Sequence, residues 1–155
     1  MQHILVVDDE IGIRELLSEI LSDEGYQVRL AENAADARAF RSQARPDLVL
    51  LDIWMPDTDG ITLLKEWAAA GLLTMPVVMM SGHGTIDTAV EATRIGAYDF
   101  LEKPIALQKL LATVGRALKQ GGERTPAALS LASLGRAPLV VELKRRSAVL
   151  VWRSP

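Results

Sequence analysis

The chain has 155 residues, of which 49% are hydrophobic and 24% charged, so it can form one globular domain with an extension and is too apolar for a disordered segment. It contains no cysteine, which excludes a disulfide framework and a thiolate zinc site and fits a reducing compartment. Residues 1–112, with 18 Asp/Glu and 9 Lys/Arg, are not expected to bind nucleic acid directly, whereas the cations scattered over residues 113–155 are typical of a solvated surface.

Strand and helix patterns alternate from the N-terminus. The apolar run His3–Val7 predicts a buried strand, and it is followed by the pair Asp8-Asp9. Residues 11–23 place Ile and Leu at helical spacing and predict an amphipathic helix. Residues 26–30 alternate in polarity, which favours an edge strand, and residues 34–43 predict an Ala-rich helix.

The same alternation continues to residue 118. The run Asp47–Leu51 ends in Asp52, the run Pro76–Met80 ends in Ser81, and the run Tyr98–Leu101 is followed by Lys103-Pro104. Between and after these predicted strands lie three segments with helical spacing: 61–67, which begins after Gly60, 85–95, and 106–118. The segment 85–95 groups Ile86, Ala89, Val90 and Thr93 on one side and has little apolar area to hold it in place.

Five strand-helix units in succession predict an α/β protein with a parallel sheet covered on both faces. Right-handed crossovers favour an open, doubly wound, five-stranded parallel sheet of order 2-1-3-4-5, a flavodoxin-like fold. Such sheets bind ligands at the carboxyl ends of the strands where the strand order reverses, between the first and third strands. Asp8, Asp9 and Asp52 end these two strands, so we expect them to meet at one site.

The predicted cluster of carboxylates suits a divalent cation. Three carboxylates in one pocket repel one another, and a hard cation that prefers oxygen ligands, such as Mg²⁺, removes that conflict. We expect Asp9 and Asp52 to bind Mg²⁺ directly, the backbone carbonyl of Trp54 to add a neutral ligand, and Asp8 to act through a bound water. The alternative is that Asp8-Asp9 is a solvated helix N-terminus.

The residue types at the strand ends predict phosphoryl transfer. Asp52 is the candidate nucleophile, because a carboxylate can accept a phosphoryl group as an acyl phosphate. Lys103 is a cation able to reach phosphate oxygens, and the Ser81 hydroxyl can donate to one. The Lys103-Pro104 bond is a candidate for the cis form.

Residues 1–119 resemble the receiver domain of bacterial two-component response regulators. The motifs that carry the resemblance are Val6-Val7-Asp8-Asp9-Glu10, Leu51-Asp52-Ile53-Trp54-Met55-Pro56-Asp57-Thr58-Asp59-Gly60, Ser81-Gly82-His83-Gly84 and Phe100-Leu101-Glu102-Lys103-Pro104. The resemblance implies that Asp52 accepts phosphate from a sensor histidine kinase, with Mg²⁺ held by Asp8 and Asp9. It also implies a phosphoacceptor that assists its own phosphorylation and dephosphorylation rather than an enzyme acting on other substrates.

The same resemblance suggests a switch and two tuning positions. Ser81 would move toward the phosphate and Phe100 would turn inward, so that helix 85–95, strand 98–101 and helix 106–118 form the face that signals. That face could also form a homodimer. Trp54 and His83 occupy positions that in this family flank the approach of water, and a large indole at Trp54 could slow hydrolysis; an indole without kinetic effect is the alternative.

The C-terminal part departs from the strand-helix pattern. Residues 120–138 read as a linker, and residues 139–155 as a tail resembling the truncated start of an AAA+ ATPase domain. The motif phrasing around Ser81 is similar to that of receivers of the nitrogen-regulation type, which precede an AAA+ domain and a DNA-binding domain. The output is therefore expected to be transcriptional, through an attached output domain; a stand-alone receiver that binds a target protein or relays phosphate is the alternative. No phosphate-binding ATPase loop occurs in the sequence.

Two other interpretations are disfavoured. Asp57-Thr58-Asp59-Gly60 resembles part of a calcium loop but lacks its later ligands. A phosphatase with an Asp nucleophile would need a D-x-D motif where this chain has Asp8-Asp9-Glu10.

There is no apolar run of membrane-spanning length and no signal-peptide pattern, so we expect a cytoplasmic protein with no membrane partner.

Overall fold

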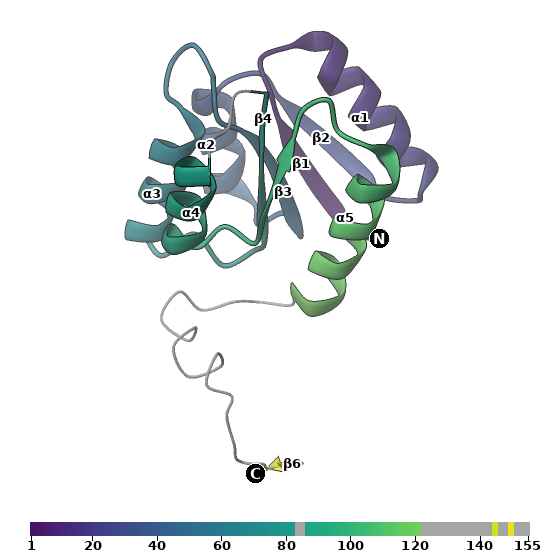
Figure 1. The fold of residues 1–155 in the computed structure, drawn as a ribbon, viewed down its shortest axis with the longest axis vertical. Helices are drawn as coiled ribbons and strands as arrows, with labels where there is room; N and C mark the ends of the chain where they lie inside the picture. Colours follow the sequence, from purple (N-terminus) through teal and green to yellow (C-terminus); the bar gives the residue numbers. More distant parts are fainter. Residues whose placement is uncertain (83–85, 122–143, 146–148, 151–155) are drawn as a thin grey trace. The chain divides into compact units, whose positions relative to one another are not determined.

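The computed structural model describes residues 1–82 and 86–121, together with two short strands in the C-terminal part (Figure 1). The chain divides into two compact units, Met1–Arg124 and Thr125–Pro155. In the second unit, β6 (Lys144–Arg145) and β7 (Val149–Leu150) pair as antiparallel strands. Residues 120 and 121 of the predicted linker are helical. The rest of the predicted linker and tail lies outside the described residues, so the boundary at 138 stays a prediction.

The first unit confirms the predicted fold. Five parallel strands form one sheet in the order β2-β1-β3-β4-β5. The strands are β1 (His3–Val7), β2 (Gln27–Ala31), β3 (Leu48–Asp52), β4 (Val77–Ser81) and β5 (Asp99–Glu102). The helices are α1 (Ile11–Asp23), α2 (Ala34–Gln43), α3 (Gly60–Ala69), α4 (Ile86–Ile95) and α5 (Leu107–Gly121).

The sheet is buried on both faces, which explains the continuous apolar runs of its inner strands. Leu5, Val49 and Met79 belong to the hydrophobic cluster shared with α2, α3 and α4. Ile4, Leu50 and Met80 belong to the cluster shared with α1 and α5. Figure 1 shows the same two layers of helices, with α1 and α5 on one side of the sheet and α2, α3 and α4 on the other. The edge strand β2 is the most exposed, as its alternating sequence predicts.

Helix α4 packs differently from what its apolar residues suggest. Ile86 is 83% exposed and Val90 is 42% exposed, whereas the fully buried residue is Ala92. The side grouped by sequence spacing therefore faces largely outward, and Ala92 and the half-buried Ile95 make the contact with the core. An exposed ion pair of 3.2 Å between Lys65 and Glu91 links α3 to α4. Helix α4 is thus held by little buried apolar area, as expected for an element that shifts.

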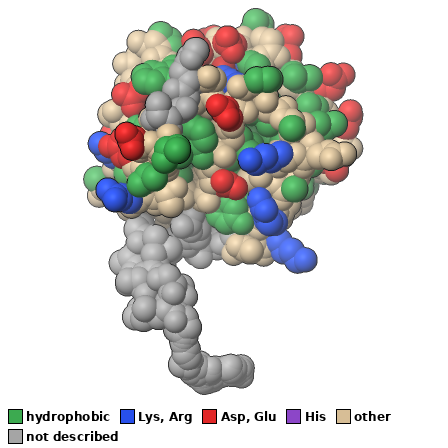
Figure 2. Space-filling view, in the orientation of Figure 1, with side chains coloured by type: hydrophobic (Ala, Val, Ile, Leu, Met, Phe, Trp, Pro, Cys, Tyr) green, Lys and Arg blue, Asp and Glu red, His purple; other side chains and the backbone are tan. Residues whose placement is uncertain are grey.

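The surface carries both signs of charge. On the face shown in Figure 2, acidic and basic side chains are interspersed with apolar ones. Within the described ranges, no helix combines the length and the apolar character needed to cross a bilayer.

Candidate functional site

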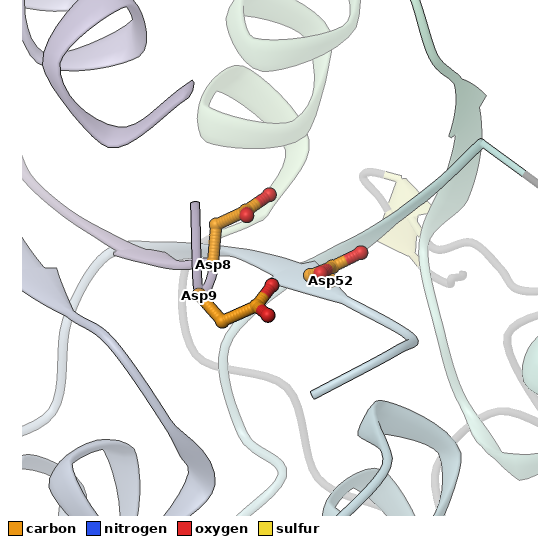
Figure 3. Close-up of side chains that lie close together, drawn as sticks. All are labelled: Asp8, Asp9 and Asp52. Carbon is orange, nitrogen blue, oxygen red and sulfur yellow. The ribbon is translucent and has the colours of Figure 1, made fainter. Parts of the chain in front are cut away.

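Three carboxylates meet at the carboxyl ends of β1 and β3. Asp8 and Asp9 follow β1, and Asp52 is the last residue of β3, the strand that pairs directly with β1. One oxygen from each lies within 4.8 Å of the others (Figure 3). Asp8 and Asp52 are buried, and Asp9 is exposed. The structure thus brings together the acidic residues that the sequence places at the reversal of strand order.

Lys103 places a cation among these carboxylates. Its Nζ lies 2.7 Å from Oδ2 of Asp8 and 3.4 Å from Oδ1 of Asp52, and its side chain is only 15% exposed. The residue follows β5, and its backbone N–H donates to the carbonyl of Ser81 at 2.8 Å, which continues the sheet beyond the strand. The Lys103-Pro104 peptide bond is cis, as predicted.

The site changes the proton affinity of both Asp52 and Lys103. Burial is the main cause that raises the pKa of Asp52 to about 6, and the charge of Asp8 adds to it while Lys103 opposes it. Burial lowers the pKa of Lys103, but the hydrogen bond with Asp8 and the charge of Asp52 outweigh it, so that this pKa is raised. The Lys103 ammonium therefore stays charged. Lys103 does not fully offset the burial of Asp52 and the charge of Asp8, so the pKa of Asp52 stays raised.

The donor set fits a hard divalent cation. The three carboxylates offer oxygen ligands, which Mg²⁺ prefers. A divalent cation would also reduce the charge repulsion between Asp8 and Asp52. An open pocket of about 330 Å³ gives access to Asp9 and Asp52 and is lined by Asp9, Glu10, Asp52, Trp54, Gly82 and Lys103.

Backbone contacts hold the end of β3 in place. The N–H of Ile53 donates to the carbonyl of Met80 at 3.0 Å, and the N–H of Gly60 donates to the carbonyl of Ile53 at 2.7 Å. A Cβ on Gly60 would collide with the carbonyl of Asp52, so only glycine allows α3 to begin this close to β3. Arg14 of α1 donates to the carbonyl of Asp8 at 2.6 Å and steadies the acidic loop from the other side.

The structure describes three of the other predicted site residues, Trp54, Ser81 and Phe100. Ser81 is fully buried at the end of β4, and Trp54 is 54% exposed and lines the pocket. Phe100 on β5 is half-buried and packs against the cluster shared with α2, α3 and α4. His83 lies outside the described residues, so its predicted role stays a prediction.

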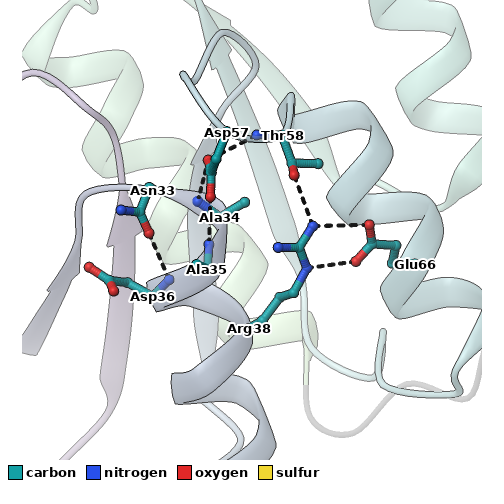
Figure 4. A network of polar contacts seen from close by, with 8 residues as sticks. All are labelled: Asn33, Ala34, Ala35, Asp36, Arg38, Asp57, Thr58 and Glu66. Carbon is teal, nitrogen blue, oxygen red and sulfur yellow. Dashed lines mark hydrogen bonds and ion pairs between the residues drawn. The ribbon is translucent and has the colours of Figure 1, made fainter.

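Sequence reasoning missed two features of the site. Glu10 lines the pocket, and its Oε1 lies 3.8 Å from Nζ of Lys103. Its position next to Asp8-Asp9 in the sequence could have indicated that it belongs to the site. The second feature is a polar network in which Asp57 contacts the start of α2, and Arg38 of α2 contacts Thr58 and Glu66 (Figure 4). No local pattern reveals that network, because its members come from segments far apart in the sequence.

A doubly wound sheet with clustered carboxylates and a lysine at its strand ends defines the class of receiver-like α/β proteins. A family model described as response regulator receiver domain matches residues 4–115. The chain therefore belongs to the response regulator receiver family of two-component systems.

The relatives agree with this assignment. The chain is 47% identical over 122 residues to the nitrogen assimilation regulatory protein NtrX of Azorhizobium caulinodans, a match covering 77% of this chain and 27% of NtrX. It is 38% identical over 154 residues to the DNA-binding transcriptional regulator NtrC of a Bradyrhizobium species, covering 96% of this chain and 32% of NtrC. The crystal structure of the NtrX receiver domain from Brucella abortus aligns with 50% identity and a TM-score of 0.70, covering 76% of this chain and 98% of that domain. The chain thus spans roughly a quarter to a third of the length of these full-length regulators.

Proposed function

We propose that Asp52 is the phosphoacceptor of this receiver and takes its phosphoryl group from a phosphohistidine of a sensor kinase. The observation that carries the proposal is the position of Lys103, whose ammonium contacts both Asp8 and Asp52 in an open, acidic pocket. This arrangement supplies a nucleophile, a cation for the arriving charge and room for a phosphoryl group.

In the proposed transfer, a carboxylate oxygen of Asp52 forms a bond to phosphorus as the phosphorus–nitrogen bond of the phosphohistidine breaks. The electron pair of that bond returns to the imidazole nitrogen, and the product is an acyl phosphate. Lys103 would contact the oxygens of the transferred group, and the Ser81 hydroxyl would donate to one of them. Asp52 must be ionised to attack, so its raised pKa makes a second cation useful at neutral pH.

Asp9, Asp52 and the backbone carbonyl of Trp54 are the proposed direct ligands of Mg²⁺, with Asp8 acting through a water. When bound, the ion would offset negative charge on the phosphoryl oxygens. Asp8 also holds Lys103 by its 2.7 Å contact, so this carboxylate would serve both cations of the site.

The output is proposed to be regulation of transcription in the bacterial cytoplasm, through a domain attached to the receiver. The NtrC relative is named a DNA-binding transcriptional regulator, which supports a transcriptional output. The match with that protein extends over 96% of this chain, which favours an attached output domain over a stand-alone receiver.

The elements α4, β5 and α5 form the proposed signalling face, which is also the proposed homodimer surface. Support comes from the outward apolar residues Ile86 and Val90 on α4, which leave apolar surface exposed on this face.

The test is intact mass after incubation with Mg²⁺ and acetyl phosphate, a phosphoryl donor of small size. The wild-type protein is expected to gain the mass of one phosphoryl group, and Asp52→Asn is expected to gain none. Lys65→Met, which removes an exposed lysine from α3, serves as the control and should be phosphorylated as the wild type is. Absence of an adduct in a wild-type protein that binds Mg²⁺ would sink the proposal.

A further inference from the structure

The loop between β3 and α3 carries the proposed neutral ligand of the metal, the carbonyl of Trp54. Residues 53–59 have no regular secondary structure. Hydrogen bonds at Ile53 and Gly60 fix the base of this loop against β4 and α3. Its outer part is held by α2, an element that contributes no residue to the phosphorylation pocket.

Asp57 makes the main contact between the loop and α2. Its Oδ1 accepts from the backbone N–H of Ala34 at 3.0 Å, and its Oδ2 accepts from that of Ala35 at 2.9 Å. These N–H groups belong to the first turn of a helix and have no acceptor within the helix itself. The carboxylate thus combines charge-assisted hydrogen bonds with a favourable position at the positive end of the helix dipole. The Thr58 N–H donates to Oδ1 at 2.9 Å and fixes the carboxylate orientation.

Proton affinity agrees with this geometry. Burial raises the pKa of Asp57, but the hydrogen bonds from Ala34, Ala35 and Thr58 together outweigh it, so that the pKa lies below its usual value. The carboxylate is therefore ionised at neutral pH and accepts through both oxygens.

Arg38, one turn further along α2, makes the second contact. Its Nε and Nη2 donate to the two carboxylate oxygens of Glu66 on α3 at 2.8 and 3.1 Å, and Nη2 also donates to Oγ1 of Thr58 at 3.0 Å. Figure 4 shows that α2 contacts the loop at Asp57 and Thr58 and contacts α3 at Glu66. The loop that carries Trp54 is thereby fixed from base to tip.

We propose that Asp57 is a positioning residue for the metal site: by fastening the loop to α2, it sets the orientation of the Trp54 carbonyl and so the affinity for Mg²⁺. The inference rests on the proposed metal site. It differs from a purely structural role, in which Asp57 would only cap α2. Loss of a cap lowers the free energy of unfolding but leaves the affinity of the folded protein for Mg²⁺ unchanged.

The test is calorimetric titration of the full chain with Mg²⁺, without a phosphoryl donor. Asp57→Ala is expected to raise the Kd for Mg²⁺ about tenfold, the lower end of what loss of a supporting partner costs a metal site. Asp57→Asn should raise it less, because the amide oxygen can still accept from the start of α2. The control is Asp36→Asn, which removes an equal charge from the same turn of α2 but whose carboxylate makes no hydrogen bond with the described residues. Its Kd should stay within about twofold of wild type, since exposed charges are screened.

Urea unfolding without Mg²⁺ reports separately on the cap. If the Kd is unchanged in both Asp57 variants while stability falls, Asp57 is only a cap and the inference is overturned. If the wild-type protein itself does not bind Mg²⁺, the proposed metal site fails and takes the inference with it. A normal wild-type Kd with unchanged variants therefore separates failure of the inference from failure of the proposed function.

Discussion

The Lys103 ammonium donates a 2.7 Å hydrogen bond to the Asp8 carboxylate, although the two residues are 95 positions apart in the sequence. Their strands, β5 and β1, are separated in the sheet by β4 and β3. The lysine side chain therefore reaches across the ends of two strands and passes Asp52 at 3.4 Å on the way. One cation thus serves two buried carboxylates.

Removal of the Lys103 charge should destabilise the protein in the absence of metal. Lys103→Met leaves Asp8 and Asp52 buried without a cation, and we expect the free energy of unfolding at pH 7.5 to fall by about 2 kcal/mol. Saturating Mg²⁺ should restore most of this loss, because the ion supplies the missing charge. Urea unfolding with and without Mg²⁺ measures both effects.

The matched control removes a lysine from an exposed pair. Lys65→Met breaks the contact with Glu91, in which both side chains are about half exposed. Such pairs contribute little, so the change should stay within about 0.5 kcal/mol and should not depend on Mg²⁺. Equal losses in the two variants would contradict the role assigned to Lys103.

The contribution of Asp52 to stability without metal should fall as the pH rises from about 4 to 6. Asp52 has a pKa of about 6 in the folded protein against 3.8 for the unperturbed group, so the folded state binds more protons in this range. The contribution of protonated Asp52 to stability is complete below pH 3.8 and is lost as the pH rises through about 6. Asp52→Asn should therefore stabilise the protein by about 2 to 3 kcal/mol at pH 7.5 without Mg²⁺. The gain should vanish at pH 4; a gain independent of pH would argue against this assignment.

Gly60 should not tolerate a side chain. In Gly60→Ala the new methyl group meets the backbone carbonyl of Asp52, which must move, and we expect a loss of about 1 to 3 kcal/mol together with slower phosphorylation. Gly115→Ala in α5 is the control, because a Cβ there has no neighbour within 4 Å, and it should stabilise the helix by about 0.5 to 1 kcal/mol. Thermal unfolding of both variants, with phosphorylation rates, decides the matter.

Trp54 is expected to shield the acyl phosphate from water. Its indole is 54% exposed and lines the pocket, so Trp54→Asn should open the path of water and shorten the half-life of the phosphorylated protein several-fold. Trp54→Phe, which keeps an aromatic ring, should have a smaller effect. Intact mass recorded over time follows the loss of phosphate and gives the half-life. An unchanged half-life in Trp54→Asn would show that the indole has no kinetic role.

The sheet and most of the site could be predicted because their signals are local. Strands buried on both faces appear as continuous apolar runs, and the polar residue that ends each run must lie at the same edge of a parallel sheet. For that reason Asp8, Asp52 and Lys103 could be assigned to one pocket from the sequence alone. The cis bond before Pro104 also followed from residue type.

The remaining features depend on contacts between distant segments. The outward position of Ile86 could not be read from spacing, because helical periodicity groups residues on a side without saying which side faces the core. In the sequence Asp57 stands out only as part of a motif that resembles a calcium loop, and only the folded chain brings it to the start of α2. Such long-range polar contacts have no sequence period and so give no signal.

The central claim is that Asp52 itself carries the phosphoryl group. Its most direct test is treatment of the protein with acetyl phosphate and Mg²⁺, reduction of the acyl phosphate with borohydride, and peptide mass mapping. The account predicts that the aspartate reduced to homoserine is residue 52 and that Lys103→Met lowers the yield. Modification at Asp8 or Asp9 with Asp52 unchanged would contradict it.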